Sequence, residues 1–393
     1  MPSNSYCPVC GSNNTFEFLR REKVPVHQNL LVADQDEARN INFGSLCMYC
    51  CKNCSFIYNH CFDPDKLSYG DHYDNSQEYS TYFNNYLKGL AKYLLQKKEI
   101  TASKIVEVGC GKGNFLRLLV SDGKRNNIGY GFDPSYVGPV SDLNNRLNFE
   151  KRFYGKDCAD LKADIVVCRH VIEHVPDPIE LLDSIRFALM GSCDAKVFFE
   201  TPCTEWILEN KVIWDFFYEH CSMFTVRSLA TAFQLSGFQV TTAKKVFGGQ
   251  YLWLEAVPAS GKIKEINKYF YNRNNIEALA YQFAERENEL IVNWIIKIKK
   301  LAENGKLAVW GGGAKGVTFV QLVDPEGKYI ECIIDLNPNK QGKFLPGSGH
   351  PIIGIKEAGK MDIKYAILMN PNYFEENTQL ILKERVNLKL ITC

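Results

Sequence analysis

The sequence contains no apolar run long enough to cross a membrane, and its start shows no charged segment followed by an apolar one. We therefore expect a cytoplasmic protein that has no membrane partner. An excess of charge of one sign is also absent, because 46 Lys and Arg residues are mixed with 45 Asp and Glu residues to give a net charge of +1. Without a broad basic surface, nucleic acid is not expected as a partner.

The chain also lacks two signatures of phosphate-binding turns. Residues 105–115 read as a buried strand, a glycine turn and the start of a helix, yet this turn does not have G-x-G-x-x-G spacing, and no Walker consensus is present. The turn contains Gly109, Gly111 and Gly113. Glycines here allow positive φ and close approach to a ligand, although they also occur simply to pack a helix on a strand.

A second strand, residues 128–132, ends at Asp133 about 20 residues after the first, a distance at which ribose hydroxyls are commonly bound. Glu107, the short glycine turn and Asp133 resemble the first two motifs of class I S-adenosylmethionine-dependent methyltransferases. This resemblance implies an adenosyl cofactor without a phosphate to bind, which agrees with the missing phosphate signatures.

The chain has 15 cysteines, and six of them fall between Cys7 and Cys54, which favours metal binding over disulfides. Two C-x-x-C pairs suit a tetrahedral ion: Cys7 with Cys10, and Cys51 with Cys54. Cys47 and Cys50 form a competing pair, and free cysteines in a small core are the alternative without metal. A closed set of four thiolates predicts structural rather than catalytic Zn²⁺.

A third strand, residues 163–168, leads into a cluster that contains His170 and His174. Ligands bind at the carboxyl ends of strands in open α/β sheets, so we expect this cluster to be functional and His170 to lie at the cofactor. Histidines with a structural role are the alternative. A helix over residues 180–187 and a strand over 195–200 continue the alternation, which predicts a doubly wound, mostly parallel sheet.

A second chemical cluster, residues 214–224, combines aromatic, acidic and imidazole side chains without helical periodicity. Aromatic walls exclude water, and Glu219 beside His220 can set the orientation and proton affinity of the imidazole, as a general base requires. A buried, hydrogen-bonded histidine behind an aromatic core is the alternative.

Towards the carboxyl terminus, residues 307–317 repeat the theme of strand, glycine turn and helix, which predicts a Rossmann-like unit. Its turn and Lys315 suit either phosphate binding or plain packing. The expected domains are a zinc-binding domain at 1–68, a methyltransferase domain at 69–260, a helical linker at 261–304 and a substrate-binding domain at 305–393.

With these blocks in order, the chain resembles the nucleotide-sugar C-methyltransferase family over nearly its whole length. The motifs that carry the resemblance are residues 169–174, 219–220, 247–251 and 340–347. The resemblance implies methylation of a carbon beside the ketone of a nucleotide-linked 4-keto-deoxysugar that is bound between the middle and last domains. It implies that His220 abstracts the proton, Glu219 orients it and His174 stabilises the enolate.

One departure from the family is that the pattern Tyr-x-Glu-His begins here with Phe217, and Tyr218 occupies the next position. If that phenol steadies the enolate or donates a proton, we expect this protein to use Tyr218, another tyrosine or a different substrate. An O- or N-methyltransferase of a sugar or another small metabolite is the second interpretation, because the cofactor motifs do not specify the acceptor atom. A third is a nucleic-acid-binding zinc-knuckle protein with an inactive methyltransferase fold.

Overall fold

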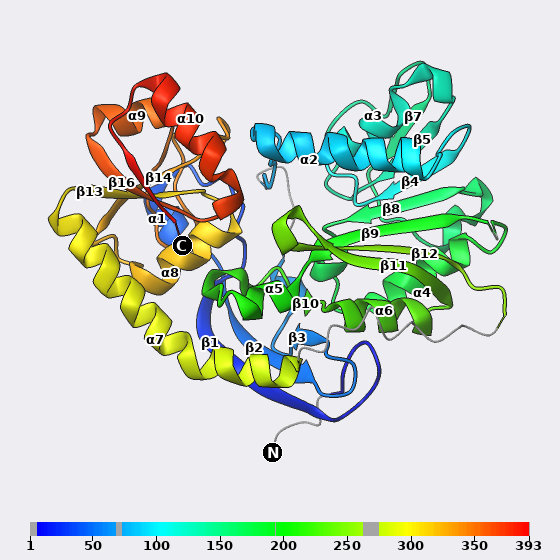
Figure 1. Cartoon of the computed structure of the whole chain (residues 1–393), viewed down its shortest axis with the longest axis horizontal. Helices are drawn as coiled ribbons and strands as arrows, with labels where there is room; N and C mark the ends of the chain where they lie inside the picture. The colour runs from blue at the N-terminus through cyan, green and yellow to red at the C-terminus, as the bar shows by residue number, and fades with distance from the viewer. Residues whose placement is uncertain (1–5, 68–72, 193, 262–274, 393) are drawn as a thin grey trace.

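The protein is described here by a computed structural model that covers residues 6–67, 73–192, 194–261 and 275–392. The described chain forms three β-sheets, which Figure 1 shows below, to the right and to the left of the centre. The predicted boundary between residues 68 and 69 and the first part of the predicted linker lie outside the described residues. In these four ranges, no helix combines the length and the apolar character that crossing a bilayer requires.

The N-terminal sheet is antiparallel and has the strand order β1-β2-β3-β10. Its strands are β1 (Thr15–Pro25), β2 (Phe43–Cys51), β3 (Ile57–Asn59) and β10 (Ser222–Met223). The same region contains α1 (Gln35–Arg39) and the 3-10 turn η1 (Pro64–Lys66). Because β10 comes from the middle of the chain and begins two residues after His220, this sheet is completed by the predicted catalytic segment.

The central sheet has eight strands in the order β11-β12-β9-β8-β4-β5-β7-β6. Five neighbours from β9 to β7 are parallel, and β11, β12 and β6 add antiparallel pairs at the two edges. The strands are β4 (Lys104–Val108), β5 (Ile128–Phe132), β6 (Ser141–Asp142), β7 (Leu147–Glu150), β8 (Ile165–Arg169), β9 (Lys196–Pro202), β11 (Phe238–Val246) and β12 (Tyr251–Pro258).

Helices cover both faces of this sheet, as Figure 1 shows with α2 on one side and α4 and α6 on the other. Alternate residues of β4 separate the faces: Ile105 packs with α2 and α3, whereas Val106 packs with α4 and α6. The helices are α2 (Thr81–Lys92), continued by η2 (Tyr93–Lys97), α3 (Asn114–Val120), α4 (Pro178–Ala188), α5 (Thr204–Glu209) and α6 (Val226–Leu235). Short turns are η3 (Gly123–Arg125), η4 (Lys156–Leu161), η5 (Ile172–His174), η6 (Ile213–Asp215) and η7 (Phe247–Gly249). The expectation of a doubly wound α/β fold is confirmed.

The C-terminal sheet is entirely parallel, with the order β15-β14-β13-β16-β17, as a Rossmann-like unit requires. Its strands are β13 (Lys306–Trp310), β14 (Ile330–Ile334), β15 (Ile352–Ile353), β16 (Ile363–Leu368) and β17 (Lys389–Thr392). Its helices are α8 (Ala314–Val323), α9 (Ile355–Lys360), η9 (Pro371–Tyr373) and α10 (Phe374–Glu384).

The long helix α7 (Ile276–Glu303) runs from the N-terminal sheet to the C-terminal sheet, along the lower left of Figure 1. The N-terminal region also contacts the connection between β14 and β15, because Val32 forms a β-bridge with Phe344, and Gly347 donates a backbone hydrogen bond to Ala38. The three sheets therefore pack around a common centre rather than following one another in a row.

Candidate functional site

The four cysteines predicted to bind zinc lie together beside the N-terminal sheet. Their sulfur atoms are all within 4.8 Å of one another, with 3.6 Å between Cys7 and Cys54 and 3.6 Å between Cys10 and Cys51. Sulfur ligands at the usual Zn–S distance on a tetrahedral ion would be separated by about 3.8 Å. The cluster therefore has the donor atoms and the spacing that Zn²⁺ takes.

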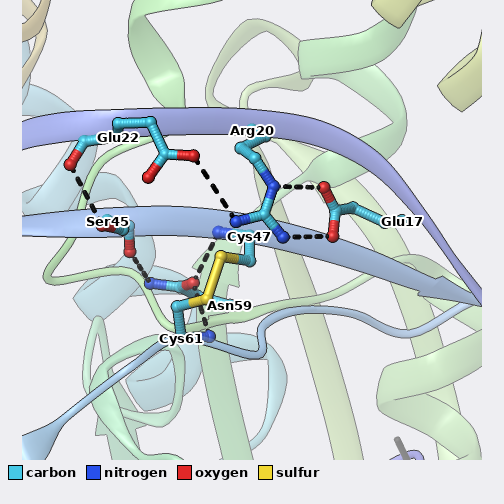
Figure 2. Close-up of polar contacts among 7 residues, drawn as sticks. All are labelled: Glu17, Arg20, Glu22, Ser45, Cys47, Asn59 and Cys61. Carbon is cyan, nitrogen blue, oxygen red and sulfur yellow. Dashed lines mark hydrogen bonds and ion pairs between the residues drawn. A yellow bond between two sulfur atoms is a disulfide. The ribbon is translucent and has the colours of Figure 1, made fainter. Parts of the chain in front are cut away.

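The competing pair does not form, and one expectation about cysteine needs correction. Cys47 makes a disulfide with Cys61, and the amide oxygen of Asn59 accepts hydrogen bonds from the backbone N–H groups of both cysteines (Figure 2). Cys50 points into a hydrophobic cluster on the face of β2 opposite to Cys51. The prediction of metal rather than disulfides was wrong for Cys47, because its partner lies beyond the C-x-x-C spacing on which the prediction relied.

The three glycines of the first turn have different roles. Gly109 and Gly113 both have positive φ, and a Cβ atom would lie 2.1 Å from Val171 at the first position and 2.5 Å from Phe149 at the second. Gly111 also has positive φ, but a Cβ atom there would meet nothing within 4 Å. The outer glycines are therefore required for packing, and Gly111 borders open space through which a ligand can approach the backbone.

Two acidic side chains support this turn. Asp133, at the end of β5, accepts the N–H of Gly111 at 2.8 Å and the N–H of Ser135 at 2.8 Å. Glu107 is 3% exposed and accepts the N–H of Leu116 at 3.0 Å, and its burial raises its pKa to about 8. Glu107 thus holds the start of α3 from beneath the turn, whereas Asp133 holds the backbone of the turn from the end of β5.

Glu173 brings the histidines of the third strand end together. One oxygen of its buried carboxylate lies 3.2 Å from Nδ1 of His170, and the other accepts the hydroxyl of Thr201 at 3.0 Å. Ligating atoms of Glu173, His174 and His220 all lie within 4.8 Å of one another. Burial alone would raise the pKa of Glu173, but the hydrogen bond with His170 and the nearby imidazoles lower it to about 2. The carboxylate is therefore ionised.

His220 lies against Glu173 and His174. Its ring centroid is 4.8 Å from that of His174, nearly perpendicular to it, and 4.1 Å from that of Phe217. Burial, followed by the influence of His174, holds the pKa of His220 well below its usual range. The imidazole is therefore neutral near pH 7 and able to accept a proton.

The two residues that precede His220 do not have the positions that the sequence predicts. The carboxylate of Glu219 accepts the backbone N–H of Gln28 at 3.0 Å and the hydroxyl of Tyr73 at 2.7 Å. The carboxylate beside the imidazole is instead that of Glu173, which the sequence analysis did not select. Its position between two histidines in one short motif was the available signal, whereas nothing local pointed to Gln28 or Tyr73.

Tyr218 points away from the imidazoles, contrary to the expectation that its phenol replaces a catalytic one. Its hydroxyl accepts the N–H of Asp63 at 2.8 Å and lies 3.2 Å from the carbonyl oxygen of the same residue. Its ring is fully buried against Gly44, where a Cβ atom would come within 2.3 Å of it. Phe217, not Tyr218, lines the cavity between the central and C-terminal sheets.

A cavity of about 320 Å³ lies between the central and C-terminal sheets. One wall carries the imidazoles with Glu173 and Phe217, another carries the second glycine turn and its lysines, and residues 75–77 with Tyr79 and Ser80 close a third. The first glycine turn is not part of these walls. It lies behind residues 74–80, because Lys112 is 3.7 Å from Asp74 and 3.6 Å from Glu78.

The second glycine turn, between β13 and α8, repeats the first in its construction. Asp335, at the end of β14, accepts the N–H of Gly312 at 2.7 Å, as Asp133 does in the central sheet. The ammonium group of the buried Lys340 donates to the carbonyl of Gly312 at 3.0 Å, and Lys315 forms an ion pair with Asp215. Two cations and the N-terminus of α8 thus face the cavity opposite the imidazoles.

Two family models match the chain. A methyltransferase domain model matches residues 79–243, and a C-methyltransferase C-terminal domain model matches residues 265–384. Among curated proteins, the C-methyltransferase NovU of Streptomyces niveus is 26% identical over 388 residues, which cover 94% of this chain and 90% of that protein. The ubiquinone biosynthesis O-methyltransferase of Salmonella paratyphi A is 28% identical over 106 residues, which cover 25% of this chain and 42% of that protein.

Solved structures resemble the central part of the chain. The 1,6-didemethyltoxoflavin-N1-methyltransferase of Burkholderia thailandensis, solved with 1,6-didemethyltoxoflavin and S-adenosylhomocysteine, has 15% identity and a TM-score of 0.36, covering 46% of this chain and 82% of its own. The magnesium protoporphyrin IX methyltransferase of Synechocystis PCC 6803, solved with S-adenosylhomocysteine, has 16% identity and a TM-score of 0.34, covering 45% and 84%.

Proposed function

We propose that this chain, which is an S-adenosylmethionine-dependent C-methyltransferase, methylates the carbon beside the ketone of a nucleotide-linked keto-deoxysugar. The proposal is carried by His220, a neutral imidazole in the wall of a cavity that extends to the C-terminal sheet. A hydrogen beside a ketone is acidic, because the charge left on the carbon spreads to the oxygen. Methylation of such a carbon requires a base of this kind.

In the proposed mechanism, His220 removes the proton from the carbon, and the electron pair of the broken C–H bond forms an enolate. Glu173 then lies close enough to stabilise the positive imidazolium. His174 stands beside His220, where it can stabilise the enolate oxygen. When bound, S-adenosylmethionine supplies an electrophilic methyl group to the deprotonated carbon.

The cofactor is proposed to lie between Gly111, Asp133 and His170. Open space at Gly111 lets a ligand approach the backbone, and Asp133 presents a carboxylate at the edge of the sheet. His170 borders the cavity at the end of β8, next to β4 in the sheet. These residues would bind the adenosyl part on one side and leave its reactive end towards His220.

The nucleotide of the substrate is proposed to bind at the second glycine turn. Lys315 and Lys340 supply positive charge there, and the N-terminus of α8 favours an anion. The sugar would then extend across the cavity towards His220. Asp215 currently pairs with Lys315, so a bound phosphate would compete with that carboxylate.

For the N-terminal cysteine cluster we propose structural Zn²⁺, held by Cys7, Cys10, Cys51 and Cys54. Four thiolates fill a tetrahedral ion and leave no position open for a substrate. The ion would contribute to folding of the N-terminal sheet, whose strand β2 carries Cys51, and not to methyl transfer.

The experiment that tests the function combines hydrogen exchange with methyl transfer. Purified protein is mixed with dTDP-, CDP- and GDP-4-keto-sugars in heavy water, with and without S-adenosylmethionine carrying a labelled methyl group. We expect exchange of the hydrogen beside the ketone and transfer of the label to that carbon. Replacing His220 by Asn should slow both by about 10² to 10⁴-fold, the usual contribution of a general base.

His60→Asn is the matched control, because His60 is an exposed histidine of the N-terminal region. It should leave both rates unchanged. Methyl transfer that persists in His220→Asn without any exchange would contradict carbon methylation and favour an O- or N-methyltransferase. Mass spectrometry of the product identifies the acceptor atom directly.

A further inference from the structure

A buried arginine of the N-terminal sheet supports the loop that carries His220. Arg21 is on β1, and its guanidinium donates to the carbonyl of Ile213 at 2.6 Å and to the carbonyl of Phe216 at 2.9 Å. The same group donates to Glu287 of α7 at 2.6 Å and 2.8 Å. Arg21 is 9% exposed, so these interactions are formed away from water.

The geometry of the loop shows what these contacts constrain. Ile213 is the first residue of η6, and Phe216 is the residue directly after η6. The guanidinium therefore holds both ends of the turn that precedes Phe217. The backbone N–H of His220 in turn donates to the carbonyl of Phe217 at 3.2 Å. A planar group with donors in fixed directions sets the orientation of two peptide planes at once, which a single flexible contact does not do.

Two further contacts make the support continuous. The hydroxyl of Tyr218 is hydrogen-bonded to the backbone of Asp63, and Ser222 is the first residue of β10, which pairs with β3. All three attachments lie in the N-terminal region, whereas His220 itself projects to the other side, into the cavity. The N-terminal region therefore forms the floor under the proposed base.

We infer that Arg21 is a positioning residue for His220, which acts through the carbonyl groups of Ile213 and Phe216. The inference rests on the proposed function, in which His220 is the base. Displacement of a reacting group by about 1 Å can cost about 10²-fold in rate. The guanidinium of Arg21 limits such displacement because it fixes the loop that carries His220. Glu287 in turn holds the guanidinium in place.

The neighbouring residue on β1 provides a matched control. Arg20 lies on the opposite face, where it pairs with Glu17 at 2.6 Å and Glu22 at 3.6 Å at the surface (Figure 2). Arg20→Lys and Arg21→Lys make the same chemical change one residue apart. Lysine keeps the charge, but its compact ammonium group cannot reach Glu287 and both carbonyls in the same fixed geometry.

We expect Arg21→Lys to lower kcat and the rate of hydrogen exchange by about 10 to 10²-fold. KM for S-adenosylmethionine should change by less than about twofold, because the guanidinium bonds to Ile213, Phe216 and Glu287, none of which is proposed to bind the cofactor. Arg20→Lys should change neither kcat nor KM. If Arg21→Lys does not fold, Glu287→Gln replaces it, since this variant weakens the anchor and retains the guanidinium. It should lower kcat by a smaller factor.

A second readout does not depend on the substrate. Proteins with ¹⁵N-labelled histidine are titrated by NMR, with the His220 signal assigned from His220→Asn. In the wild type the imidazole should stay neutral well below pH 6.5, and in Arg21→Lys its pKa should rise towards that ordinary value as the loop loosens and water enters. Arg20→Lys should titrate like the wild type.

The two readouts separate the possible failures. A wild-type protein that exchanges no hydrogen in any keto-sugar contradicts the proposed function, while the titration still decides the role of Arg21. A titration and a kcat in Arg21→Lys that both match those of Arg20→Lys overturn the inference. A lower melting temperature in Arg21→Lys with unchanged kcat and unchanged His220 titration would make Arg21 a residue of stability alone, which also overturns it.

Discussion

Glu173 holds a negative charge at the point where three imidazoles meet. Its carboxylate contacts His170 directly and lies within 4.8 Å of the ligating atoms of His174 and His220. An opposite charge at this distance favours the protonated form of an imidazole. Glu173 therefore raises the pKa of His220, whereas burial lowers it.

The pH dependence of kcat should report this balance. A base acts only while it is unprotonated, and burial lowers the pKa of His220, so kcat should begin to fall only below about pH 6.5, the ordinary value for histidine. Glu173→Gln removes a charge that raises this pKa. In that variant the acid limb should move to still lower pH, and the plateau of kcat should drop because a less basic imidazole removes the proton more slowly.

Glu205→Gln serves as the control for this measurement, because Glu205 is another buried carboxylate of the central region, which accepts the N–H of Val226. In Glu205→Gln the acid limb of the pH dependence of kcat should lie at the same pH as in the wild type. A limb that moves to higher pH in Glu173→Gln would contradict the charge balance described here.

At this scale the sequence indicated two segments that the structure brings to one cavity, but it did not indicate which carboxylate lies beside His220. The cluster around His170 and the segment around His220 both border the cavity. Glu219 was selected because it precedes His220 in the chain, yet neighbouring side chains at a turn point in different directions. Glu173 reaches His220 only after two distant strand ends meet, which one sequence cannot reveal. The roles of these residues stay predictions.

Among the elements, the parallel strands were predictable, whereas the antiparallel strands of the N-terminal sheet were not. β8 begins with a continuous apolar run, and β4 is apolar apart from Lys104 and Glu107, because helices cover both faces of the sheet. β10 has two residues, too few to show periodicity, and its partner β3 lies far away in the chain. Cys61 escaped attention for a similar reason, since its disulfide with Cys47 has no spacing rule.

The N-terminal sheet offers a matched pair of cysteines that tests the proposed metal site. Cys51 belongs to the cluster, and its neighbour Cys50 faces the other side of β2. Elemental analysis of the purified protein should find about one zinc per chain. Cys51→Ser should lose most of the metal and melt at a lower temperature, because structural zinc contributes directly to folding.

Cys50→Ser should keep the full metal content, whatever its effect on packing. Equal metal content in the two variants would contradict the proposed ligand set. A folded wild-type protein without zinc would remove the proposal altogether.

Considered as a whole, the molecule is held together across the cavity by polar contacts. The side-chain amides of Gln250, from the central sheet, and Asn370, from the C-terminal sheet, exchange two hydrogen bonds of 2.9 Å and 3.0 Å. Glu376 of α10 accepts the hydroxyl of Ser80 at 2.6 Å, at the start of α2. Both contacts border the cavity, so docking of the two sheets and the shape of the proposed substrate site are linked.

A double-mutant cycle measures this link. Gln250→Leu leaves a buried amide group of Asn370 without its partner, and Asn370→Leu does the reverse, so each should lower the free energy of unfolding by about 1 to 3 kcal/mol. Since the two residues form one pair, the coupling energy should fall between about 0.5 and 3 kcal/mol. KM for the nucleotide sugar should rise in both variants, while KM for S-adenosylmethionine stays the same. Additive effects would show that the pair does not connect the sheets.

The order of domains along the chain was predictable, but their mutual arrangement was not. Composition and periodicity reveal where one kind of element gives way to another, and they carry no information about docking. Val32 and Ala38 contact the connection between β14 and β15 from within the segment expected to form a separate zinc domain. The domain boundaries therefore stay predictions, while the parallel C-terminal sheet agrees with the expectation.

The pairing of β10 with β3 also has a consequence for biosynthesis. A ribosome releases the chain from its amino end, so β3 emerges long before Ser222 and Met223, which complete its sheet. The edge of β3 that pairs with β10 therefore stays unpaired until most of the central sheet has been translated. The floor beneath the imidazole and the imidazole itself are therefore finished in the same late event, and no shorter nascent chain can assemble one without the other.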